Sequence, residues 1–175
     1  NGSSQDFSGT VGSNQFNLST STNASLTVEI GILPTTSQNT AFTWAGSDNA
    51  GQWAIHAHTP ESALVRFDTI ARATYRLDAS YNPQNILNTF TFVVRSDTFR
   101  AIYRNGVLIQ SASDVGNITY PIPIQPLLIG ANPTGLNTSQ YSFKGRIAQV
   151  LIYNGALSAA EILQNYNDTK GRYGL

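Results

Sequence analysis

The sequence contains no cysteine and no methionine, and it has few charged residues. Without cysteine there can be no disulfide, no thiol nucleophile and no cysteine-based zinc site. Charged residues make up 11% of the 175 residues, against about 25% in average soluble proteins, so coiled coils and long ion-paired helices are not expected. The 10 basic residues balance the 10 acidic ones, which argues against recruitment of nucleic acid or of an anionic membrane.

Long hydrophobic runs are also missing. No stretch approaches the roughly 18 apolar residues that span a bilayer, and the N-terminus lacks the charged-then-apolar layout of a signal peptide. We therefore expect no membrane insertion. Because the chain starts at Asn1 and has no methionine, we expect a processed chain or a domain cut from a larger protein.

Short segments rich in β-branched and aromatic residues recur along the chain, with turn residues between them. This pattern is typical of an all-β sandwich or barrel. We expect a single domain over residues 1–175, in which residues 1–24, rich in Ser, Thr, Asn and Gly, form a lead-in with short strands. The predicted strands are 25–33, 40–45, 52–58, 63–77, 89–95, 98–104, 107–111, 127–130 and 146–153.

Two turns join the strands of the middle region. Asn105-Gly106 supplies the two positive-φ positions of a type I′ hairpin turn between residues 101–104 and 107–110. A second hairpin is predicted at residues 96–98. Together they predict three adjacent antiparallel strands from residue 89 to residue 111.

One helix is indicated near the C-terminus. Ser158 and Glu161 have the spacing of a capping box, and Leu157 is placed to pack against the first turn. We expect two to three helical turns that end near residues 167–168. The apolar stripe of this helix would be Ile162, Leu163 and Tyr166.

The second half of the chain resembles a laminin-G-like domain of the concanavalin A-like lectin/glucanase superfamily. The resemblance is carried by the segments YRNG at 103–106, LIG at 128–130, FKGRI at 143–147, VLIYN at 150–154 and the closing helix signal at 156–162. It implies a jelly roll of two curved antiparallel sheets that binds ligands on its concave face or at its rim loops. Members are mostly carbohydrate or protein binders, often calcium-assisted, and some are glycosidases; they occur in secreted proteins, adhesins and viral or phage structural proteins.

The segment 64–77 alternates between two kinds of residue. Its odd positions are largely apolar, while Arg66, Asp68, Arg72 and Arg76 share the even side. Arginine has a planar fork that matches carboxylate or sulfate groups. The even side is therefore either a ligand surface or a solvated face on which arginines pair with Asp68 or Asp78.

His56 and His58 lie two residues apart, so both point to one side of a strand. A zinc site would need a third ligand, such as Asp68; otherwise the histidines line a polar sheet face. If Trp53 and Ile55 face the core, the histidines share the outward side with the arginines. The ligand-binding residues that we predict are His56, His58, Arg66, Asp68, Arg72, Arg76 and Trp53, and the predicted ligand is a glycan or an acidic polysaccharide.

The polar segment 46–51 lies between strands that carry tryptophans and is bounded by glycines. Asp48 and Asn49 offer hard oxygen ligands, so one hypothesis is a calcium site, and the sequence indicates no other cofactor. The alternative is a turn closed by Asx hydrogen bonds.

Catalysis by paired carboxylates is not expected. The three glutamates are Glu29, Glu61 and Glu161, and no two acidic residues stand two positions apart, as in the glucanase arrangement that the resemblance implies. We predict a non-catalytic glycan-binding or adhesion module, located outside cells or on a virion surface. The alternative is a structural module on a viral or phage particle that contacts neighbouring copies or other subunits.

Overall fold

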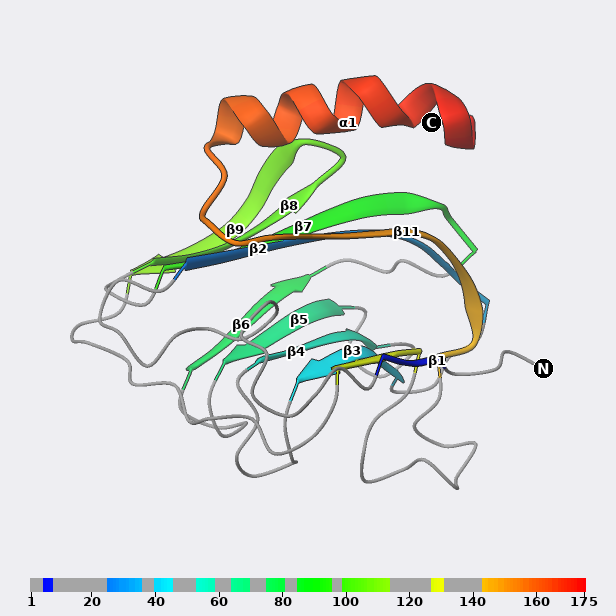
Figure 1. Cartoon of the computed structure of the whole chain (residues 1–175), viewed down its shortest axis with the longest axis horizontal. Coiled ribbons are helices and arrows are strands. Elements are labelled where there is room, and N and C mark those ends of the chain that lie inside the picture. Colours follow the sequence, from blue (N-terminus) through cyan, green and yellow to red (C-terminus); the bar gives the residue numbers. More distant parts are fainter. Residues whose placement is uncertain are drawn as a thin grey trace.

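Two antiparallel sheets face each other, and α1 covers the outer face of one of them (Figure 1). The computed structural model describes residues 5–7, 25–35, 40–45, 53–58, 64–69, 75–80, 85–95, 99–113, 127–130 and 143–175. The six-stranded sheet has the order β1 (Gln5–Phe7), β10 (Leu127–Ile129), β3 (Thr40–Ala45), β4 (Trp53–His58), β5 (Leu64–Thr69) and β6 (Tyr75–Ser80). The five-stranded sheet has the order β11 (Gly145–Tyr153), β2 (Ser25–Pro34), β7 (Asn88–Arg95), β8 (Phe99–Arg104) and β9 (Val107–Ser113). This architecture confirms the predicted all-β sandwich with a C-terminal helix.

The predicted strand 63–77 is wrong in one respect, because it is two strands. β5 and β6 pair antiparallel, with Phe67 opposite Leu77. Both residues therefore keep the same side of the sheet, and the alternation in the sequence continues across the connection. Residues 70–74, which include Arg72, lie outside the described residues.

The hairpin between β8 and β9 is confirmed. Asn105 and Gly106 have φ values of 50° and 78°, as a type I′ turn requires. The Asn105 side chain also ties the turn to β7: its Oδ1 accepts a hydrogen bond from the Thr89 backbone N–H at 2.9 Å, and its Nδ2 donates to Asn88 Oδ1 at 3.0 Å. The three-stranded meander β7–β8–β9 is confirmed as well, although residues 96–98 are not described.

The main core lies between the two sheets. β2 and β7 alternate regularly, and every second side chain of each strand points to the other sheet. From the six-stranded sheet, Ile55, Leu77 and Ala79 reach the same cluster. The buried side chains contributed by the five-stranded sheet are Leu26, Val28, Ile30, Ile32, Phe90, Phe92, Val94 and Ile102.

A second, smaller core lies between α1 (Ala159–Tyr173) and the outer face of the five-stranded sheet. Ile162 is fully buried there against Val93, Ala101 and Tyr103. Leu157 packs against the same cluster, in agreement with the predicted contact before the first turn. No helix among the described residues has the length and apolar character of a membrane-spanning segment.

The capping box that begins α1 is confirmed. Ser158 Oγ accepts from the Glu161 backbone N–H at 3.3 Å, and Glu161 Oε2 accepts from the Ser158 backbone N–H at 2.7 Å. The predicted end near residues 167–168 is wrong, because the helix continues to Tyr173 and ends at Gly174 with φ 70°. Leu163 does not belong to the buried stripe, since 45% of it is exposed.

Candidate functional site

The register of β4, β5 and β6 decides which of the predicted ligand-binding residues can meet. Ile55, Leu77 and Ala79 are buried. Phe67 of β5 stands opposite both Ile55 and Leu77. The residues between these positions therefore belong, by backbone alternation, to the outer face of the six-stranded sheet.

Two rows of polar residues cross the three strands on that outer face. In the first row His56 stands opposite Arg66, and Arg66 stands opposite Asp78. In the second row Asp68 stands opposite Ala54 on one side and Arg76 on the other. The register thus places four of the predicted residues, His56, Arg66, Asp68 and Arg76, in these two rows.

The remaining predicted residues are placed differently. His58 lies at the end of β4, opposite Leu64, on the same face as His56. Trp53 has the parity of Ile55, so its position belongs to the opposite face of the sheet. Arg72, Asp48 and Asn49 lie outside the described residues. No group of three or more His, Cys, Asp or Glu that would hold a metal is found within the described ranges.

The register also shows which acidic residues lie opposite the two arginines of this face. Each of the arginines at positions 66 and 76 has an aspartate as a directly opposite cross-strand neighbour. In general, opposite charges at directly opposite positions of neighbouring strands attract one another. This register is compatible with the arginine–aspartate pairing that the sequence left open as the alternative to a ligand surface.

A polar cluster beneath α1 was not predicted. It is built around Glu29, which is fully buried at the middle of β2 on the outer face of the five-stranded sheet. The neighbouring strand β11 has a β-bulge between Ile147 and Gln149. Because the bulge reverses the alternation, Ile147 and Val150 both pack toward the main core, and Gln149 takes the outer face beside Glu29.

Hydrogen bonds fix the orientation of this cluster. Tyr173 Oη of α1 donates to Gln149 Oε1 at 2.9 Å, which directs the amide nitrogen of Gln149 to Glu29. Gln149 Nε2 then donates to Glu29 Oε1 at 2.8 Å. Asn165 Nδ2 of α1 donates to Tyr153 Oη at 3.0 Å. Glu29 Oε2 is buried and has no hydrogen-bond partner.

The burial changes the acidity of two groups in this cluster. Desolvation raises the pKa of Glu29 above its ordinary value of 4.5, and the amides of Asn165 and Gln149 offset only part of the rise. Desolvation and the nearby Glu29 carboxylate raise the pKa of Tyr153. A signal for this cluster exists in the sequence, since Glu29 is the one acidic residue of its strand, but burial could not be inferred before the position of α1 was known.

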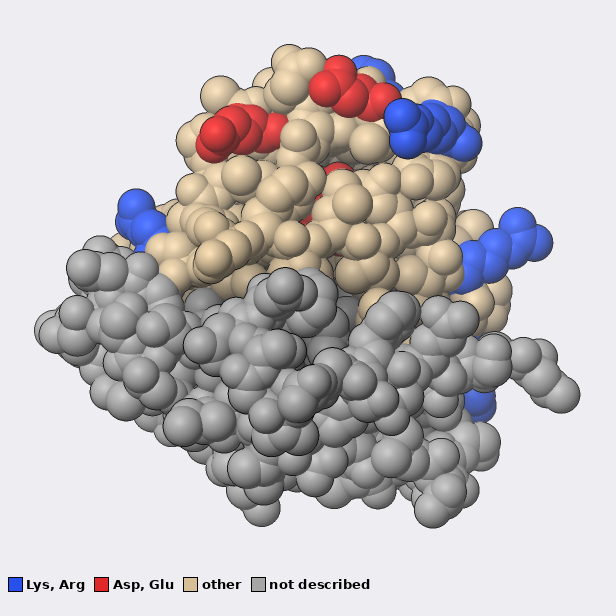
Figure 2. Space-filling view, viewed as in Figure 1, with Lys and Arg blue, Asp and Glu red and all other residues tan. Residues whose placement is uncertain are grey.

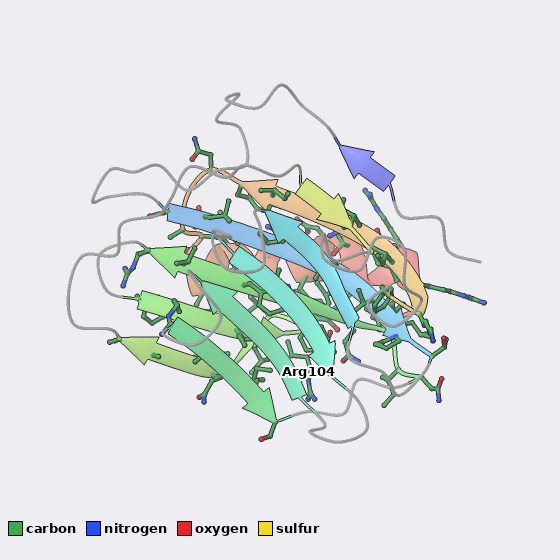
Figure 3. The ribbon with its side chains drawn as sticks, turned by 90° about the horizontal axis from the view of Figure 1, so that it is seen from below. Arg104 is labelled. Carbon is green, nitrogen blue, oxygen red and sulfur yellow. The ribbon has the colours of Figure 1, made fainter. Side chains whose placement is uncertain are left out.

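Two arginines on β8 were also missed. Arg100, only 3% exposed, and the half-buried Arg104 alternate with outward residues and so take the side of Ile102, toward the other sheet. β8 lies across the sandwich from β6. Figure 3, which looks from the side of the six-stranded sheet, shows Arg104 near one end of the sandwich. Alternation in the sequence did not identify them, because both faces of β8 are buried.

The surface around α1 carries few charges. Figure 2 shows separate acidic and basic groups on the helix and basic groups farther out, with uncharged surface between them. On this face the described part of the chain therefore offers no continuous charged patch for a polyanion or polycation.

Comparisons with known proteins agree with the fold. A family model described as "Concanavalin A-like lectin/glucanases superfamily" matches residues 7–163. Among curated protein sequences, nothing matches.

Solved structures with a similar fold include a pentraxin and domains of two enzymes. A heptameric SAP-like pentraxin from Limulus polyphemus has a TM-score of 0.64 at 16% identity, over 81% of this chain and 69% of its own. The CBM40 of the Ruminococcus gnavus IT-sialidase, bound to α2,3-sialyllactose, has a TM-score of 0.64 at 16% identity, over 82% of this chain and 83% of its own. Domain 4 of AbnA, an extracellular arabinanase from Geobacillus stearothermophilus, in complex with arabinotriose, has a TM-score of 0.60 at 17% identity, over 81% of this chain and 66% of its own.

Proposed function

This chain belongs to the concanavalin A-like lectin/glucanase superfamily, and we propose that it is a non-catalytic module that binds glycans on the outer face of its six-stranded sheet. Two structures of similar fold are carbohydrate-binding parts of larger enzymes, in complex with sialyllactose and with arabinotriose. These likenesses lie below 25% identity and support the fold alone, so the support for the ligand surface comes from the strand register of this chain.

The observation that carries the proposal is the alignment of polar residues across β4, β5 and β6. His56, Arg66 and Asp78 form one cross-strand row, and Asp68 and Arg76 belong to the next. Cross-strand neighbours lie about 5 Å apart, so a row across the three strands spans about 10 Å. Carboxylates accept hydrogen bonds from sugar hydroxyls, and guanidinium groups donate to them.

The register also favours one kind of glycan. Each arginine at positions 66 and 76 is opposite an aspartate, so β5 and β6 carry equal numbers of arginines and aspartates at these positions, and the register does not favour a sulfated or polyacidic chain. We therefore propose a ligand rich in hydroxyl groups, with at most one acidic group per binding unit. Arg72, which was predicted to extend the row, would add the charge that an acidic sugar needs.

The proposal includes the absence of glycosidase activity. The superfamily also contains glucanases, whose chemistry needs two carboxyl groups at a defined separation. Glu29 is buried beneath α1, and Glu161 caps the helix, so neither is available on the ligand face. Asp68 and Asp78 lie on the proposed face, but each has an arginine as its direct cross-strand neighbour.

The alternative role, a structural module of a viral or phage particle, is supported only by the amino-acid composition of the chain. None of the three relatives described above is a particle protein by its name. The pentraxin is heptameric, so contact between copies remains part of the proposal, as does an extracellular location.

A glycan array, followed by calorimetry on the best ligand, tests the proposed function. We expect saturable binding that the double variant Arg66→Ala and Arg76→Ala weakens at least tenfold. The same titration in chelator tests the calcium predicted at Asp48 and Asn49.

The control is Arg172→Ala, because Arg172 is an exposed arginine of α1, on the far side of the other sheet. It should leave the affinity unchanged. Unchanged affinity in the double variant would overturn the assignment of this face, and an array without hits would overturn glycan binding itself.

A further inference from the structure

Glu29 is an ionisable group in a place where ionisation is costly. It lies on β2, the second strand of its sheet, and α1 covers it, so that none of its side chain is exposed. One carboxyl oxygen accepts a single hydrogen bond from Gln149, and the other accepts none. An ionised carboxylate offers about four acceptor sites, so most of its hydration is lost here without replacement.

The groups that face Glu29 do not supply a compensating charge. On β11 the residue directly opposite is Leu151, and the diagonal neighbours are Gln149 and the titratable Tyr153. On β7 the residue opposite is Thr91. From α1, Asn165 and Tyr173 join the cluster through their hydrogen bonds.

The charged residues of α1 are engaged elsewhere or exposed. Glu161 caps the helix through Ser158, Asp168 accepts from Gln164, and Lys170 donates to Asn167. Arg172 is exposed. No cation among the described residues therefore pairs with Glu29 under the helix.

Part of the interface between α1 and the sheet is this polar cluster. Two of its hydrogen bonds, Tyr173 to Gln149 and Asn165 to Tyr153, connect the helix directly to β11. The apolar part of the interface contains one fully buried helix residue, Ile162, near the first turn. The C-terminal half of α1 thus rests largely on the polar cluster around Glu29.

We propose that Glu29 and its cluster form a proton-operated latch: α1 is held on the five-stranded sheet while Glu29 is protonated, and loss of that proton releases the C-terminal half of the helix. Protonation removes the buried charge and turns one carboxyl oxygen into a donor. Tyr153, the diagonal cross-strand neighbour of Glu29, offers its Oη as an acceptor. Release lets water reach the carboxylate.

The direction of the effect follows from proton linkage. Burial raises the pKa of Glu29 in the docked state above the ordinary 4.5, which it regains when the helix is released. The docked state therefore binds more protons in the window between these two values. Docking is strongest below pH 4.5. Between pH 4.5 and the docked-state pKa, the opening constant rises by up to about tenfold per pH unit, so docking weakens. Above that pKa the opening constant levels off.

Hydrogen exchange of the α1 amides at a series of pH values, corrected for the intrinsic pH dependence of exchange, measures the opening constant. In the unmodified chain we expect the constant for residues 166–173 to rise with pH as described. In Glu29→Gln, which keeps shape and removes the charge, it should not change with pH. The control is Glu161→Gln, which changes an exposed glutamate of α1 itself. In this variant the opening constant should still rise with pH.

A direct titration keeps the proposal testable if Glu29→Gln does not fold. The side-chain carboxyl carbons of the three glutamates can be followed by NMR in the unmodified chain. A Glu29 midpoint clearly above 4.5 supports the latch. A midpoint at or below 4.5, or a rise in opening that persists in Glu29→Gln, would overturn it.

Discussion

Strands β2 and β7 of the five-stranded sheet are buried on both faces, but different chemistry fills the two sides. On the inner face, toward the other sheet, Val28, Ile30, Phe90 and Phe92 have no exposed surface and form a continuous apolar core. On the outer face, beneath α1, buried Thr27, Glu29 and Thr91 come from the same two strands. Thus β2 and β7 contribute both an apolar layer and a largely polar one.

The two layers are stabilised in different ways. The inner layer depends on apolar area removed from water and on close packing. The outer layer depends on satisfying polar groups: Thr27 Oγ1, for example, donates to Gly155 O at 2.8 Å and accepts from the Leu157 N–H at 2.9 Å. These bonds fix the segment that leads from β11 into α1. The inner layer therefore sets the stability of the domain, and the outer layer sets where the helix lies.

Phe92→Ala should have the largest effect, because it opens a cavity in the inner layer. Truncation of a fully buried phenylalanine costs about 3–5 kcal/mol in the free energy of unfolding. Denaturant unfolding measures it. The control is Leu163→Ala on α1, which is 45% exposed and should cost only about 1 kcal/mol. Similar losses in both variants would contradict the division into layers.

Gly106→Val should have the next largest effect, at the tip of the β8–β9 hairpin where it meets α1. A β-branched residue at φ 78° is strained, and a Cβ there would lie 2.9 Å from Leu163 Cδ1 and 3.2 Å from Leu163 Cα. The backbone term alone is worth about 1–3 kcal/mol. A lowered melting temperature is expected, together with faster hydrogen exchange in α1. An unchanged melting temperature would contradict the turn and its contact with the helix.

Much of the fold could be predicted because its signals are local. The Asn105-Gly106 turn, the capping box of Ser158 and Glu161, and the strand pattern depend on residues adjacent in the chain. Two predictions failed, the single strand 63–77 and the helix end near 167–168, because the local sequence pattern does not mark where these elements end. The alternation runs on from β5 into β6 because Phe67 and Leu77 share a side. Gly171 is a residue type that disfavours helices, yet α1 passes through it. Beyond its chain neighbours and the helix backbone, no atom lies within 4 Å of a Cβ added there.

The site was harder to predict, because a face is defined by what covers it. The alternation of residues 25–33 predicts one apolar side and one polar side, but it does not say that a helix more than a hundred residues later buries the polar side. For the same reason Glu29 was judged only as a catalytic residue. The predicted face of His56, Arg66, Asp68 and Arg76 needs only strand parity and pairing, so part of it could be assembled from the sequence.

Glu161→Gln should have the smallest effect, and it sharpens the comparison because its pH dependence has the opposite sign to that of Glu29. Backbone and side-chain hydrogen bonds from Ser158 lower the pKa of Glu161 below its ordinary 4.5. The folded state thus binds this proton less readily than the unfolded state, and the ionised carboxylate stabilises the helix at pH values above 4.5. That contribution is lost as pH falls through the lowered pKa.

Because glutamine also fits a capping box, Glu161→Gln should lower the melting temperature only slightly at neutral pH, and the difference from the unmodified chain should disappear in acid. Glu29→Gln should instead be at least as stable as the unmodified chain at neutral pH and lose that advantage as pH falls to 4.5. Melting temperatures of the three proteins from about pH 3 to pH 8 would test both signs, and a Glu161→Gln difference that grows in acid would contradict the assignment.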